Sequence, residues 1–184
     1  MSKLTSENLC YLLWRERVER KDWVAQLAEW AECTQQRSKD LLRGAELLTK
    51  EQEQIAQKLG VPEEELQFKS LVEGTDILQE NLLYLFDSLE HGEGKVLAER
   101  IGANPTTVSR WRSGEQTPRK HNLVALCHFF GLSSGTNLET DPIFLSVDPV
   151  GDRQRREWLK KRIDELKLAD LQDLYPALER LFRD

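Results

Sequence analysis

Positively charged side chains gather in two short stretches of a chain that is acidic overall. Acidic residues outnumber Lys and Arg by 32 to 26, which gives a formal net charge of −6. Against this background, residues 110–120 set four cations against the lone carboxylate of Glu115: Arg110, Arg112, Arg119 and Lys120. Residues 34–43 hold Arg37, Lys39 and Arg43 against Asp40. Such a cluster is either an ordinary solvated helix face or a surface for a polyanion such as nucleic acid.

The residue types that would support catalysis or metal binding form no recognisable pattern. The three cysteines, Cys10, Cys33 and Cys127, are far apart and include no Cys-x-x-Cys pair, so they indicate neither a disulfide framework nor a thiolate metal site. His128 is next to Cys127, but neighbours on a helix point about 100° apart and cannot bind one ion. No phosphate-binding glycine loop or nucleophile motif occurs. We therefore expect no enzyme activity, no metal and no cofactor.

The cations of residues 110–120 follow a pattern of two short helices. An apolar stripe at 97–101 predicts one helix, and Gly102-Ala103-Asn104 forms a three-residue connection. Asn104 is a typical N-cap, Pro105 suits the first helical position, and Gly114 ends the second helix. This is the spacing of a helix-turn-helix.

The N-terminal part of the chain repeats this pattern. ENLCYLL at 7–13 is identical at five of seven positions to ENLLYLF at 80–86. When residues 27–44 are aligned with 97–114, Thr34 takes the N-cap position of Asn104, and both segments end in glycine. We expect four short helices in each unit, because no strand pattern competes.

Residues 79–132 resemble the Xre family, the group of the phage Cro and CI repressors. The family's helix-turn-helix pattern LAxxxGxxxxxVSxWxxG is present as Leu97, Ala98, Gly102, Val108, Ser109, Trp111 and Gly114. Residues 6–61 are similar to it in a weaker form, because Glu32 replaces the turn glycine and Ser38 stands in the position of Val108. The resemblance implies an all-α fold of two tandem lambda-repressor-like helix-turn-helix bundles, followed by a short C-terminal helical segment.

The resemblance also implies double-stranded DNA as a partner, with the third helix of each unit in the major groove. In the second unit the base-facing residues would include Arg110, whose planar guanidinium can donate two hydrogen bonds to guanine. In the first unit Gln35 and Gln36 would take equivalent positions and can bind adenine, whereas Asp40 would repel phosphate. The expected DNA-binding residues are Gln35, Gln36, Lys39, Arg43, Asn104, Thr106, Thr107, Ser109, Arg110, Arg112, Arg119 and Lys120.

Residues 135–184 differ in composition from the two units. The first part is rich in Ser, Gly, Asp and Pro, which predicts a linker anchored only by its apolar residues 143–145. A helical stripe follows, and Pro176 predicts a break between two helices near Tyr175. These helices either cover the core of the second unit or dimerise. Their leucine content favours a homodimer, which would match a palindromic operator.

These patterns predict three segments: a first helix-turn-helix unit at 1–68, a second at 69–134, and a linker with C-terminal helices at 135–184. The expected function is a sequence-specific DNA-binding transcriptional regulator, a repressor that acts by operator occupancy. The alternative is a protein-interaction adaptor or antitoxin built on the same units, which the net acidity and Asp40 favour. No apolar run reaches the roughly 18 residues that span a bilayer, so we expect a cytoplasmic protein without a membrane partner.

Overall fold

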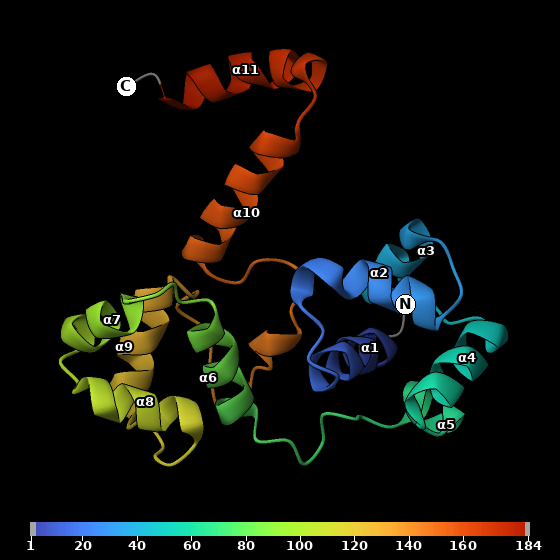
Figure 1. Ribbon diagram of the computed structural model, residues 1–184, viewed down its shortest axis with the longest axis horizontal. Helices are drawn as coiled ribbons and strands as arrows, with labels where there is room; N and C mark the ends of the chain where they lie inside the picture. Colours follow the sequence, from blue (N-terminus) through green and yellow to red (C-terminus); the bar gives the residue numbers. More distant parts are fainter. Residues whose placement is uncertain (1–2, 183–184) are drawn as a thin grey trace. The chain divides into compact units, whose positions relative to one another are not determined.

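The chain forms helices and no strands throughout residues 3–182, the part that the computed structural model describes (Figure 1). This confirms the all-α class. Within these residues no helix has the length and apolarity needed to cross a bilayer. The helices are α1 (Lys3–Arg15), η1 (Arg20–Asp22), α2 (Trp23–Trp30), α3 (Gln35–Leu42), α4 (Thr49–Leu59), α5 (Glu63–Phe68), α6 (Ile77–Asp87), α7 (Glu93–Ile101), α8 (Pro105–Ser113), α9 (Lys120–Phe130), η2 (Ile143–Leu145), α10 (Asp152–Glu165) and α11 (Leu168–Phe182), where η denotes a 3₁₀ helix.

The chain divides into two compact units. The first consists of Met1–Pro118 and Asn137–Asp148, described from residue 3 onward, and contains α1 to α8 together with η2. The second consists of Arg119–Thr136 and Pro149–Asp184, described up to residue 182, and contains α9, α10 and α11. The two residues that end the predicted segment 135–184 lie outside the described residues.

The sequence signals around α7 and α8 produce the expected local structure. Gly102 ends α7 in the left-handed conformation with φ 68°. Asn104 is extended, and its side-chain oxygen accepts a hydrogen bond of 2.9 Å from the backbone N–H of Thr106. Pro105 opens α8 and Gly114 ends it. The predicted helix, turn and second helix are therefore confirmed, and α8 packs on both α6 and α7.

A similar helix, turn and helix occurs earlier in the first compact unit. Thr34 precedes α3, and its hydroxyl accepts a hydrogen bond of 3.2 Å from the backbone N–H of Arg37. Glu32 has φ 46° at the position that aligns with Gly102. Because an L-residue in this conformation costs roughly 1–2 kcal/mol, the turn before α3 is strained where the turn before α8 is not.

The buried side of α3 contains a polar residue where α8 has an apolar one. Val108 is buried in α8, whereas the aligned Ser38 is fully buried in α3. The hydroxyl of Ser38 donates a hydrogen bond of 2.8 Å to the backbone carbonyl of Val24 in α2. This bond satisfies a buried polar group and fastens α3 to α2.

Two buried asparagines perform the same task in α1 and α6. The side-chain NH₂ of Asn8 donates to the carbonyls of Leu66 and Lys69 at 3.1 and 2.7 Å, and its oxygen accepts from the N–H of Leu71 at 2.9 Å. Asn8 therefore holds the end of α5 and the residues that follow it against α1.

Asn81 binds residues 138–144 in the corresponding way. Its NH₂ group donates to the carbonyls of Leu138 and Asp141, both at 2.8 Å, and its oxygen accepts from the N–H of Phe144 at 3.2 Å. The apolar residues 143–145 are buried, as predicted. The linker is thus anchored to α6 by hydrogen bonds as well as by apolar packing.

Aromatic side chains join α1, α6 and η2 inside the first compact unit. The ring of Trp14 lies 5.6 Å from that of Phe144 and 6.1 Å from that of Tyr84, measured between centroids. The guanidinium of Arg20 lies between the rings of Trp23 and Tyr84, 4.5 and 4.4 Å from their centroids, and donates to the carbonyl of Phe144. Burial lowers the pKa of this guanidinium, and the aromatic faces compensate for its lost hydration.

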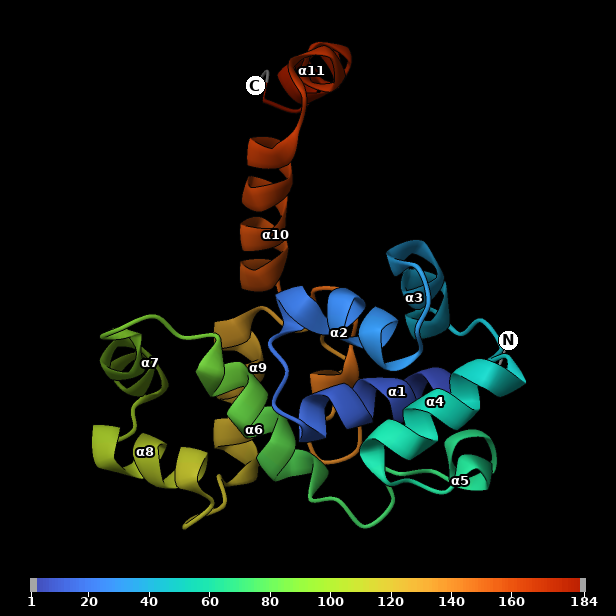
Figure 2. The same ribbon diagram turned by 45° about the vertical axis from the view of Figure 1, so that its right-hand side comes forward.

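Two sequence predictions about helix limits are wrong. The first 68 residues contain α5 and η1 in addition to the four expected helices. The helix break in the C-terminal segment falls at Leu166, which has extended backbone and ends α10, while Pro176 lies inside α11 (Figure 2). Proline costs a helix one backbone hydrogen bond, and the exposed α11 tolerates this loss.

We expect Glu32→Gly to have a free energy of unfolding about 1 kcal/mol higher than Glu32→Ala, because glycine adopts the left-handed turn without strain. Both variants lose the same contacts of Glu32 with Gln54 and Lys50, so the comparison isolates the backbone. Urea unfolding followed by circular dichroism measures the difference. Equal stability of the two variants would contradict a strained turn.

Candidate nucleic-acid interface

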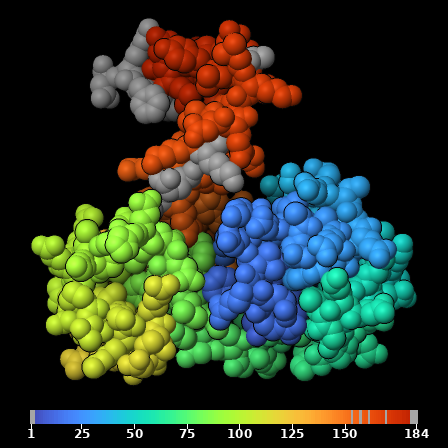
Figure 3. Space-filling view, in the orientation of Figure 1, coloured from blue at the N-terminus to red at the C-terminus, as the bar shows by residue number. Residues whose placement is uncertain are grey.

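The helix α8 buries one side and exposes the other. Trp111 is 1% exposed and Val108 is also buried, so these residues face α6 and α7. Thr106, Ser109 and Arg110 are exposed, and Arg110 has a side-chain exposure of 57%. Figure 3 shows the yellow side chains of this region at the surface. The predicted core position of Trp111 is confirmed, and the polar residues of α8 form an outward-facing ridge.

Each of the two arginines of this ridge forms an ion pair with a nearby carboxylate. A guanidinium nitrogen of Arg112 lies 2.7 Å from a carboxylate oxygen of Asp87 at the end of α6. Arg110 lies 3.9 Å from Glu115. All four side chains are more than half exposed. Exposed pairs of this kind contribute about 0–1 kcal/mol, so an incoming phosphate or base can replace the carboxylate at small cost.

The remaining expected residues of this region have different surroundings. The side-chain oxygen of Asn104 is engaged in capping α8, which leaves its NH₂ group for an outside partner. Thr107 is half-buried. In the second compact unit, Arg119 is the N-cap residue of α9 and Lys120 is its first residue, and both are exposed.

Four of the expected residues are exposed on α3 and at Arg43, the C-cap that follows it. Gln35, Lys39 and Arg43 project from the surface. Gln36 is also exposed, but its amide donates a hydrogen bond of 3.2 Å to the carboxylate of Asp40 one turn later. The face that aligns with the α8 ridge is therefore polar. Within the described part of the chain its cations Lys39 and Arg43 form no ion pair, whereas both arginines of the α8 ridge do.

Arg37, the third cation of the 34–43 cluster, is part of the fold. Its guanidinium donates two hydrogen bonds to the carboxylate of Glu51 in α4, both at 2.8 Å, and a third of 2.6 Å to the carbonyl of Glu46. Glu51 is buried and also accepts from the backbone N–H of Leu48. These bonds hold the pKa of Glu51 below, and that of Arg37 above, its usual value.

The three cysteines form no disulfide bond with one another. Cys10, Cys33 and Cys127 are free thiols, and burial raises the pKa of all three, that of Cys10 to about 12. They stay protonated at neutral pH. Among the described residues, no group of three or more His, Cys, Asp or Glu side chains is placed to hold a metal ion.

The comparison with known protein families gives one match, and it covers the ridge on α8. Residues 95–136 match the helix-turn-helix family. The matched segment begins in α7, includes α8 and continues beyond α9, so the turn at residues 102–104 lies inside it. This match supports a DNA-binding regulator in general terms. None of the curated proteins and none of the solved structures compared with the chain matches it.

The helix-turn-helix match makes the polar side of α8 the candidate surface for DNA. Exposed arginines alone are common on helices, but here they follow a capped turn within the matched segment. Sequence reasoning overlooked Asp87 and Glu51, which bind arginines of the predicted cationic clusters in addition to the Glu115 already noted there. Glu51 follows Leu48 by three residues at the start of α4, a spacing that signals a side chain folding back on a helix N-terminus.

We expect Arg37→Met to lower the free energy of unfolding by about 2 kcal/mol at pH 7, because it leaves the buried carboxylate of Glu51 without its partner. The folded-state pKa of Glu51 is lowered, so the ion pair stabilises the fold above the ordinary glutamate pKa and the stabilisation is lost as the pH falls through the folded pKa. The difference in the free energy of unfolding between wild type and Arg37→Met should therefore be smaller at pH 3 than at pH 7. Urea unfolding at both pH values measures it.

Lys58→Met is the matched control. Lys58 pairs with Glu29 at 3.7 Å on the surface, and we expect little change in stability when this pair is removed. If Arg37→Met lowers the free energy of unfolding by the same amount at pH 7 and pH 3, the ion pair with Glu51 is not the cause of the lost stability.

Proposed function

We propose that the protein is a sequence-specific regulator of transcription that binds double-stranded DNA, and that it represses by occupying its operator. The observation that carries this proposal is the outward ridge of α8, which lies within the helix-turn-helix match and is oriented by buried Trp111. Thr106, Ser109 and Arg110 stand at the positions that face base edges in this type of domain. Repression of this kind requires only that the bound protein covers the operator, so it needs no additional surface for another protein.

In this proposal the remaining DNA-binding residues of the second helix-turn-helix unit, residues 69–134, contact the DNA backbone. Arg112 exchanges Asp87 for a phosphate, and the exposed cations Arg119 and Lys120 at the start of α9 bind phosphates as well. The free NH₂ group of Asn104 and the hydroxyl of Thr107 are the neutral donors of the set. The overall charge of −6 keeps non-specific attraction to DNA low, so these local contacts decide affinity.

We further propose that residues 1–68 and 69–134 are two copies of one helix-turn-helix unit, with 135–184 as an appended segment. Three pairs of equivalent residues support the duplication: the caps Thr34 and Asn104, the left-handed turn residues Glu32 and Gly102, and the buried Asn8 and Asn81. In the first copy the DNA-binding residues would be Gln35, Gln36, Lys39 and Arg43. The compact units of the fold divide the second copy after Pro118.

The second compact unit supplies the proposed dimer contact. Trp158, Leu159, Leu168, Leu174 and Tyr175 are exposed on α10 and α11, and Leu168 is 73% exposed. Short helices with exposed apolar residues are marginally stable alone, and a second copy would bury these side chains. A two-fold dimer would present its recognition helices to a palindromic operator.

A second candidate function is a protein-interaction adaptor or antitoxin, and a specific observation on α3 favours it. In residues 1–68, the carboxylate of Asp40 accepts a hydrogen bond from Gln36, and that of Glu51 pairs with Arg37. Two side chains that could otherwise contact DNA are therefore already bound within the protein. In that case the first unit contacts a protein while the second binds DNA. Purification from the native host separates the candidates, because an adaptor copurifies with a stoichiometric protein partner that remains bound after nuclease treatment.

We expect gel shifts on genomic fragments at about 50 mM salt to detect a specific complex that weakens steeply with salt. Arg110→Ala should relax the preference at one base pair by about 1–3 kcal/mol. Arg119→Ala should instead weaken all sequences alike and reduce the salt slope by about one. Lys58→Ala, on α4, is the control that should leave binding unchanged. The proposal fails if no fragment is retarded, and the roles are wrong if both arginine variants act alike.

We expect Tyr175→Glu to convert a dimer into a monomer in sedimentation equilibrium, because it places a charge in the proposed contact. Phe68→Glu is the matched control: Phe68 is 78% exposed on α5 in the first compact unit, so its replacement should leave the dimer intact. A monomeric wild type at micromolar concentration, or a Tyr175→Glu variant that remains dimeric, would refute the dimer contact.

A further inference from the structure

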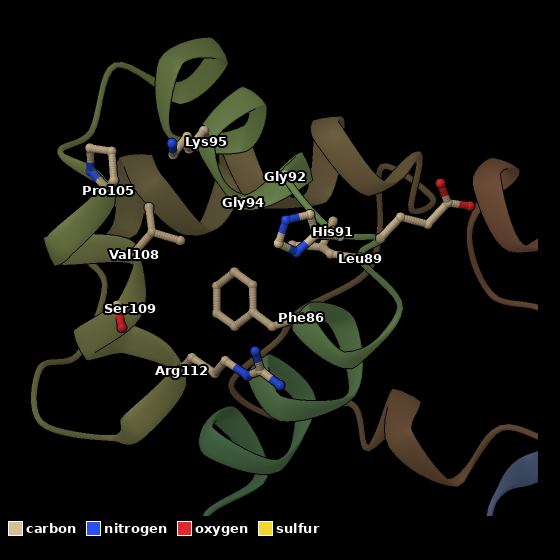
Figure 4. A pocket seen from close by; sticks show the side chains of 11 residues that line it. Phe86, Leu89, His91, Gly92, Gly94, Lys95, Pro105, Val108, Ser109 and Arg112 are labelled. Atoms are coloured by element: carbon tan, nitrogen blue, oxygen red, sulfur yellow. The ribbon is translucent and has the colours of Figure 1, made fainter.

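A pocket of about 490 Å³ opens beside α8 within the first compact unit. The end of α6, residues 89–92, the first turn of α7 and one side of α8 form its walls (Figure 4). Small-molecule sites have volumes of about 300–1,000 Å³, so this pocket has room for a ligand of roughly ten non-hydrogen atoms.

The floor of the pocket is apolar. Phe86 and Val108 are buried, and Leu89 is half-buried beside them. Figure 4 shows the ring of Phe86 between Val108 and His91. A flat aromatic group placed there could stack on or meet the edge of the Phe86 ring, as aromatic pairs prefer, and would also contact the methyl groups of Val108.

The polar lining of the pocket is mainly basic. Lys95, His91 and Arg112 line it, and Glu90 is the one carboxylate among its lining residues. Lys95 lies near Pro105 and Arg112 lies at the opposite end (Figure 4). Arg112 is bound to Asp87, whereas no described residue forms an ion pair or hydrogen bond with the side chain of Lys95. Among the described lysines and arginines of this lining, Lys95 is therefore the one without a partner.

The first turn of α7 borders the pocket, and its acidic residue Glu93 directs its carboxylate to the backbone N–H of Glu90. Gly92 precedes α7, and Gly94 and Lys95 belong to its first turn, where the helix dipole favours a negative charge. A Cβ atom added at Gly92 or Gly94 would meet nothing within 4 Å, so the backbone there is open to a ligand. A free cation and an apolar floor within one cavity define the chemistry that fits.

We propose that this pocket binds a small organic monocarboxylate with a flat apolar body, such as an aromatic acid. The carboxylate binds Lys95 at the start of α7, and the apolar body lies on Phe86, Leu89 and Val108. A neutral molecule of the same shape would leave Lys95 without a partner, and a small anion without the ring would leave the floor exposed to water.

The ligand would act on the proposed DNA function, on which this step rests. Pro105, Ser109 and Arg112 line the pocket and belong to α8, the proposed recognition helix. A ligand carboxylate in the pocket lowers the positive potential beside the DNA phosphates and competes with them for space. Binding of ligand and DNA should therefore oppose each other, and the coupling must be equal in both directions.

The test uses phenylacetate as the probe, titrated into the full chain and followed by backbone amide NMR. We expect the amide signals of Gly92, Gly94 and Val108 to shift, and phenylacetate to bind about tenfold more tightly than phenylacetamide or acetate. Lys95→Gln should reduce phenylacetate binding about tenfold and leave phenylacetamide binding unchanged. Lys58→Gln, the control on α4, should bind phenylacetate like wild type.

Equal affinity for the three probes, shifts confined to other parts of the chain, or unchanged phenylacetate binding by Lys95→Gln would each overturn the proposal. The NMR titration contains no DNA, so its result does not depend on the proposed function. A gel shift with and without saturating phenylacetate then tests the coupling: weaker DNA binding supports it, and unchanged binding refutes the coupling while leaving the pocket assignment intact.

Discussion

The burial of Trp111 fixes the orientation of α8, and every proposal about that helix depends on it. An indole side chain buries about 200 Å² of surface, which corresponds to roughly 5 kcal/mol at about 25 cal/mol per Å². Its N–H group has no hydrogen-bond partner among the described residues, a cost of about 1–3 kcal/mol. The apolar gain exceeds this cost, so Trp111 stays inside. Because Val108 lies one turn earlier on the same side, Arg110 and Ser109 must face outward.

The two buried asparagines show how short helices are assembled into a stable unit. Asn8 binds four backbone groups between Glu65 and Leu71, at the end of α5 and just after it, and Asn81 binds three between Leu138 and Phe144. Replacement of either by an apolar residue would strand those buried backbone groups, which costs more than the lost side chain itself. The identity of these positions in ENLCYLL and ENLLYLF therefore has a structural cause that composition and periodicity did not reveal.

The features that sequence predicted well are local ones. Asn104, Thr34, Pro105 and Gly114 act within one helical turn, so their capping roles follow from residue type and position. The exposed positions of Thr106, Ser109 and Arg110 followed from the buried side of the same helix. For these reasons the all-α class and the turn between α7 and α8 were predictable.

The features that sequence missed depend on residues far apart in the chain. Arg37 belongs to a cationic cluster in sequence, yet it binds Glu51, 14 residues later, because α3 and α4 bring them together. Glu32 takes a left-handed conformation against its own preference because the turn requires it. The end of α10 at Leu166 carries no glycine or proline, so only the folded chain reveals it.

The contact between Asp87 and Arg112 has a consequence for selectivity. A guanidinium already matched to a carboxylate offers little net charge to any passing polymer, so it adds little to loose attachment at random sequences. In the proposed DNA complex a phosphate at Arg112 competes with the carboxylate of Asp87, and the released carboxylate repels a poorly placed phosphate nearby. An internal competitor of this kind would favour the proposed operator over random sequences without any contact to a base.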